Sequence, residues 1–147
     1  MYSFSEDGFR SVSASKANSA SKAAKFAIDK MAQILKRFNG FAVAHGWRAV
    51  EIQKLGIKTC KLNQTGLNTF RNCSAVGVVN LDFQRPDTKI IEQHIFGEDY
   101  ARREQYVMAG GLGQSVMRSA LRLPEPLETV VAYFDERVAD LWKLFCL

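Results

Sequence analysis

The sequence predicts a helix-rich α+β fold. A long N-terminal helix is expected to pack on helices near the C-terminus, with a small antiparallel sheet or hairpin in the middle. Apolar residues recur every three or four positions over residues 15–38 and again over residues 126–145, which is the spacing of one helix face. Residues 75–83, AVGVVNLDF, are instead β-branched and partly alternating, as is typical of a strand.

Composition indicates one globular domain. The chain has 147 residues, of which 47% are hydrophobic, enough for a single core. We expect a flexible tail over the Ser-rich residues 1–14 and the domain over residues 15–147. We see no signal peptide and no apolar run as long as the roughly 18 residues of a membrane span. Three scattered cysteines favour reduced thiols in the cytoplasm.

The helix expected over residues 15–38 has two unlike sides. Its apolar side is small at the start and larger at Met31, Ile34 and Phe38, so it can accept the bulkier 126–145 helix. Self-association through either helix is the alternative and would give a homodimer. The opposite side projects Phe26 among basic residues, where a core has no use for it.

The middle of the chain is ambiguous. Residues 41–47 suit a short strand, and residues 47–55 suit either a helix that ends at Gly56 or a pair of strands, with the helix favoured. Residues 88–96 fit a strand returning to 75–83 and a helix equally well. After Gly97 we expect helices over residues 98–108, 112–123 and 126–145, with a break at the intervening glycines.

The stretch AVEIQKLGIKTCKLNQTGLNTF resembles a helix-turn-helix, with Gly56 as the turn glycine and apolar residues around it. The resemblance implies a recognition helix from Thr59 to about Phe70. If residues 75–83 and 88–96 pair, the order of elements resembles a winged helix-turn-helix domain with Arg85 at the wing tip. The alternative is an α+β domain whose middle segment is a β-hairpin.

Charge is strongly polarised along the chain. Residues 10–61 contain eleven basic and two acidic residues, a net of +9, whereas residues 62–147 contain nine basic and eleven acidic, a net of −2. A basic half favours an acidic partner: nucleic acid, DNA rather than RNA, or an acidic protein surface. The candidate nucleic-acid-binding residues are Lys22, Lys25, Lys30, Lys36, Arg37, Lys54, Lys58, Lys61, Gln64, Asn68 and Arg71.

Two overlapping segments of the C-terminal half contain residues that often bind phosphate: one is rich in glycine and the other contains two arginines. AGGLGQS could hold a phosphate at a helix N-terminus, but it lacks the Lys-Ser/Thr ending of a P-loop and the spacing of GxGxxG. QSVMRSALR resembles the arginine motif of helicases, with Met117 where that motif has a glycine and the second arginine one position late. We interpret both as a turn between two helices.

No catalytic or metal site is predicted. Cys60, Cys73, His45 and His94 are not at CxxC or HxxxH spacing, and the carboxylates fit solvated helix faces. We therefore expect no cofactor. The predicted function is a nucleic-acid-binding regulatory protein that uses a basic helical face. The alternative is a small protein-binding adaptor or inhibitor, such as an accessory protein of a mobile element, with no catalytic activity.

Overall fold

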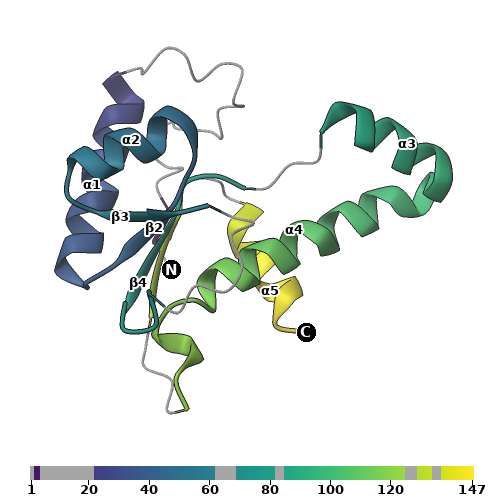
Figure 1. Cartoon of the computed structure of the whole chain (residues 1–147). Helices are drawn as coiled ribbons and strands as arrows, with labels where there is room; N and C mark the ends of the chain where they lie inside the picture. Colours follow the sequence, from purple (N-terminus) through teal and green to yellow (C-terminus); the bar gives the residue numbers. More distant parts are fainter. Residues whose placement is uncertain (1, 4–21, 62–68, 82–84, 125–128, 134–136) are drawn as a thin grey trace.

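The computed structural model describes residues 2–3, 22–61, 69–81, 85–124, 129–133 and 137–147 (Figure 1). Most of the expected 1–14 tail therefore lies outside the described residues, as does the start of the 15–38 helix. In chain order the elements are β1 (Tyr2–Ser3), α1 (Lys22–Arg37), β2 (Phe41–Val43), α2 (Gly46–Lys54), β3 (Lys58–Cys60), β4 (Ala75–Val78), α3 (Pro86–Phe96), η3 (Gly97–Asp99), α4 (Tyr100–Val116), η4 (Ala120–Arg122), β5 (Val130–Tyr133) and α5 (Arg137–Phe145), where η marks a 3₁₀ helix.

The five described strands form one parallel sheet in the order β1-β5-β4-β2-β3. In its centre Phe41 pairs with Lys58 on one side and with Val76 on the other. The predicted antiparallel sheet is therefore wrong. The winged helix-turn-helix resemblance required residues 75–83 and 88–96 to pair as strands, so it is wrong as well. Every residue of β4 is buried, because helices cover both faces of a parallel sheet. The sequence of such a strand indicates that the strand is buried, but it does not indicate whether the strand pairs in parallel or antiparallel.

Helices α1 and α2 cover one face of the sheet, and α4 and α5 cover the other (Figure 1). Alternation along β2 assigns the two cores: Phe41 and Val43 join the α4–α5 side, and Ala42 joins the α1–α2 side. The predicted packing of the N-terminal helix on the C-terminal helices is therefore wrong, because the sheet lies between them. The small residues of α1 face the sheet instead.

Glycines explain how closely α1 approaches the sheet. A Cβ at Gly77 in β4 would lie 2.7 Å from Met31 Sδ and 2.9 Å from Leu35 Cδ1. A Cβ at Gly40 would lie 2.8 Å from both Ala75 Cβ and Leu35 Cδ2. Leu35 therefore lies near the start of β4 and Met31 lies further along it. Because α1 runs antiparallel to β4, its N-terminal half lies toward the carboxyl ends of the strands.

Several elements agree with the sequence and others do not. Helix α2 and strands β2 and β4 are confirmed within the expected segments, and residues 86–96 form helix α3. The expected helix over residues 126–145 is wrong, because β5 and α5 both fall within it. The break at the glycines after Met108 is also wrong: α4 runs through them to Val116, and residues 117–118 form a turn.

The helix-turn-helix fails at its second helix. Gly56 has a φ of 79° and does turn the chain, but the chain continues into strand β3 at Lys58–Cys60. The rest of the expected recognition helix falls largely on residues 62–68, outside the described residues. Near its end, Phe70 is buried and stacks on Phe41, with ring centroids 4.3 Å apart. Phe70 is therefore a core residue.

Helix α3 and the first turns of α4 project from the body of the molecule as a two-helix arm, at the right of Figure 1. None of the described helices is both long and apolar enough to span a lipid bilayer.

Candidate nucleic-acid interface

The predicted division of the first helix into two sides is confirmed over the part that the structure describes. Ala27, Met31 and Leu35 are buried, whereas Lys25 and Lys30 are exposed on the other side, as Phe26 is. The Phe26 ring is 52% exposed, and Lys30 Nζ lies 5.4 Å from its centroid. A cation beside an exposed aromatic ring can contact a phosphate and a base together.

Some cations outside α1 are held in ion pairs. Lys89 pairs with Glu104 and Arg103 with Glu92, both at 3.4 Å. Helix α1 carries one carboxylate, Asp29, and none of its cations described here forms an ion pair with a described residue. Lys25 lies near the Glu51 carboxylate, and the exposed side chains of Lys30, Lys36 and Arg37 remain available to an anionic partner.

A second set of polar groups lies at the carboxyl edge of the sheet. The strand order reverses between β2 and β4, because α2 leaves β2 on one face and the α3–α4 segment leaves β4 on the other. Ligands of open parallel sheets bind at this kind of reversal. The backbone N–H of His45, which follows β2, donates a 3.1 Å hydrogen bond to Asn80 Oδ1, which follows β4.

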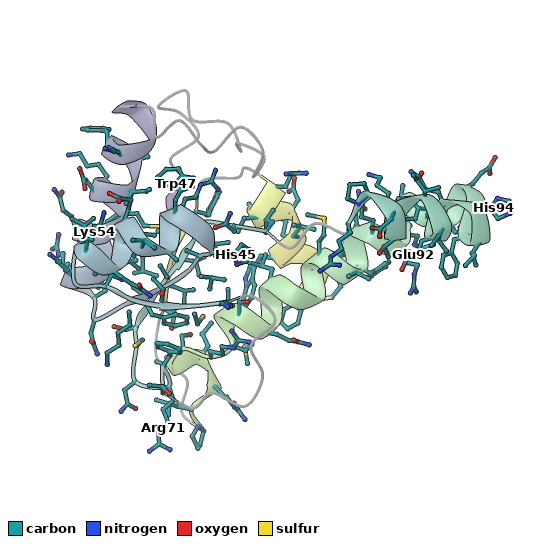
Figure 2. All side chains as sticks on the ribbon, turned by 45° about the horizontal axis from the view of Figure 1, so that its top comes forward. His45, Trp47, Lys54, Arg71, Glu92 and His94 are labelled. Atoms are coloured by element: carbon teal, nitrogen blue, oxygen red, sulfur yellow. The ribbon has the colours of Figure 1, made fainter. Side chains whose placement is uncertain are left out.

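Helix α2 begins at the same edge. Gly46 has a φ of 60°, and the helix that it opens points its first backbone N–H groups toward the carboxyl edge. Figure 2 shows His45 and Trp47 together at this end of α2 and Lys54 at the other end. The Trp47 Nε1–H is buried and has no hydrogen-bond acceptor among the described residues. A buried donor without an acceptor is costly, so a ligand that accepts from it would gain stability.

The N-terminal half of α1 extends toward the carboxyl edge, since Met31 lies beside Gly77 of β4 and α1 runs antiparallel to that strand. Lys25 lies near Glu51, toward the C-terminal end of α2. We call the surface that runs from the start of α1 across α2 to the carboxyl edge the edge surface. It consists of Lys25, Phe26, Lys30, His45, Trp47 and Asn80. Sequence reasoning identified its α1 members. It missed Trp47, and it missed Asn80, which meets His45 only through the sheet order.

The remaining predicted residues do not converge on one place. Lys36 and Arg37 lie at the other end of α1, Lys54 pairs with Glu51 at 2.7 Å, and Lys58 lies at the start of the edge strand β3. Arg71 lies far from Lys54 (Figure 2). The backbone of Lys61 follows β3, the backbone of Lys22 begins α1, and Gln64 and Asn68 are outside the described residues.

One arginine of the segment QSVMRSALR, at the end of α4, has a structural role. Arg118 is buried, and its Nη1 donates to the Lys61 carbonyl at 2.9 Å and lies 3.5 Å from Cys60 Sγ. It therefore ties the end of α4 to the end of β3. Arg122, four residues later in η4, is exposed. Gly110 and Gly111, which were considered for a phosphate loop, lie inside α4 rather than at a helix start.

The described histidines, cysteines and carboxylates form no group that could hold a metal ion. Cys60 and Cys73 are buried and Cys146 is exposed. Burial raises the pKa of both buried thiols, and the hydrogen bond with Arg118 only partly opposes this shift at Cys60. Both groups are therefore neutral, shielded thiols rather than nucleophiles.

This arrangement predicts the reactivity of the thiols. With an aromatic disulfide reagent, native protein should release one equivalent of thiolate quickly, from Cys146, and two more only on unfolding, because a thiol must ionise and be accessible to react. In Cys146→Ser the fast phase should vanish. Two fast thiols in that variant would contradict the burial of Cys60 and Cys73.

Comparison of the chain with protein-family models, curated proteins and solved structures gives no match.

Proposed function

We propose that this protein binds single-stranded nucleic acid on the edge surface. The observation that carries the proposal is the exposed cationic face of α1, which has Phe26 in its midst and no ion pairs to described residues. Phosphates would contact Lys25 and Lys30, and a base would stack on Phe26. DNA and RNA share this chemistry, and DNA is favoured as the partner.

The carboxyl edge supplies the second part of the proposed site. The first N–H groups of α2 favour a negative charge, and Asn80 lies beside them through its hydrogen bond to His45. A strand that crosses from α1 to α2 would therefore meet cations, an aromatic ring and backbone donors.

An equilibrium titration tests the proposal. A fluorescein-labelled single strand should bind the wild-type protein in an anisotropy experiment at low salt, more tightly than a duplex of the same sequence. Phe26→Ala should weaken binding of the single strand by about tenfold, since stacking on one aromatic ring is worth about 1–3 kcal/mol per base. The control Tyr106→Ala removes an exposed ring of α4 and should leave the affinity for the single strand unchanged. The proposal fails if no single strand binds.

Asn80 allows a separate test of the carboxyl edge. In Asn80→Asp, a carboxylate oxygen can still accept from the His45 N–H, but a negative charge now faces the site. We expect affinity for the single strand to fall about tenfold while the melting temperature changes little. Unchanged affinity in a folded Asn80→Asp protein would remove the carboxyl edge from the proposed site.

A further inference from the structure

The arm formed by α3 and the first turns of α4 is poorly packed within one chain. No residue of α3 is buried. Two ion pairs join α3 to α4. Two cation–π contacts add to them: Arg103 lies 4.4 Å from the Phe96 ring centroid, and Lys89 lies 5.7 Å from the Tyr100 ring centroid. Each such contact contributes about 1 kcal/mol or less at an exposed site.

Large apolar side chains are exposed on both helices of the arm. Ile90, Ile91 and Ile95 on α3 are 60–67% exposed, and Tyr106 and Val107 on α4 are nearly half exposed. Apolar groups exposed to this degree favour a covering surface. An isolated helix of 11 residues is marginal in water, so α3 needs a covering surface to be stable.

Charge restricts what can cover these side chains. Residues 85–108 contain four basic and five acidic residues, a net of −1, with both signs interspersed. Nucleic acid would find no positive field there, and a helix that binds anionic lipid needs a basic polar side. A neutral surface of mixed sign can instead face its own copy across a twofold axis, which is the commonest symmetry of soluble oligomers.

We propose that the arm is a dimerisation element: the α3 faces of two copies of this chain pack against each other around a twofold axis. Two helices from each copy then form a four-helix bundle with Ile91 and Ile95 in its core. A second copy brings the same exposed isoleucines to the contact, so each copy covers those of the other. The edge surface lies on the body rather than on the arm (Figure 2), so it remains accessible in the dimer.

Light scattering after size exclusion tests the proposal. The wild-type chain should have twice the mass of the 16.5 kDa monomer. Ile91→Glu/Ile95→Glu should be monomeric, because four carboxylates would meet at the twofold axis. The control Val50→Glu alters a similarly exposed apolar residue on α2 and should stay dimeric. A monomeric wild type at micromolar concentration, or a dimeric double variant, would overturn the proposal.

Hydrogen exchange on wild-type protein covers the case in which the double variant misfolds. Amides of residues 86–96 should become more protected as protein concentration rises through the dimer transition, while amides of α1 should not change. Protection of α3 that is independent of concentration would also overturn the proposal.

Discussion

Gly77→Val should destabilise the protein by about 3 kcal/mol, the upper part of the range for overpacking a filled core. Gly77 lies in the buried strand β4, and even its first added carbon would overlap Met31 and Leu35 of α1. Both neighbours are 0–1% exposed and have no open space to move into. Urea unfolding followed by circular dichroism measures the change.

Gly111→Ala is the matched control for this prediction. Gly111 lies inside α4, and a Cβ there would meet nothing within 4 Å. Alanine has the higher helix propensity, so this variant should be more stable by up to about 1 kcal/mol. If Gly77→Val unfolds at the same urea concentration as wild type, then α1 does not pack on β4 as described.

Charge reversal on the edge surface should have the largest effect on binding. Lys25→Glu/Lys30→Glu should weaken binding of the single strand by about a hundredfold at low salt, because two phosphate contacts are lost and two repulsions are added. Both side chains are exposed and opposite the buried face of α1, so the melting temperature should change little. Fluorescence anisotropy and thermal unfolding measure the two effects.

The control makes the same change in net charge elsewhere. Arg102→Glu/Lys143→Glu also lowers the formal charge from +5 to +1, on the exposed surfaces of α4 and α5. This control should lose only a few-fold in affinity through the long-range field. Equal losses in the two double variants would mean that overall charge, and not the edge surface, drives binding.

The three- and four-residue spacing of apolar residues was enough to predict the buried face of α1 from the sequence. Its buried and exposed residues differ in polarity, and Phe26 departs from that pattern on the exposed side. Its packing partner was not readable, because a row of alanines suits a sheet as well as a helix. Residues 126–145 were mispredicted for a similar reason. Their apolar residues follow the three- and four-residue spacing of a helix, although some of them lie in strand β5 and others in helix α5.

The direction and the order of the strands could not be predicted from the sequence either. A strand buried on both faces carries no alternation to show how it pairs, so β4 fitted a hairpin with residues 88–96 as well as a parallel sheet. The carboxyl edge could not be predicted for the same reason. His45 and Asn80 are 35 residues apart and become neighbours only because β2 and β4 pair in parallel.

The salt dependence of binding tests the central claim most directly. For a single strand, the logarithm of the association constant should fall linearly with the logarithm of salt concentration, by about 0.7 per neutralised phosphate. Because Lys25 and Lys30 contribute two contacts, Lys25→Glu/Lys30→Glu should reduce this slope by about 1.4, and Arg102→Glu/Lys143→Glu should leave it unchanged. A Lys25→Glu/Lys30→Glu slope equal to that of wild type would contradict nucleic-acid binding on the edge surface.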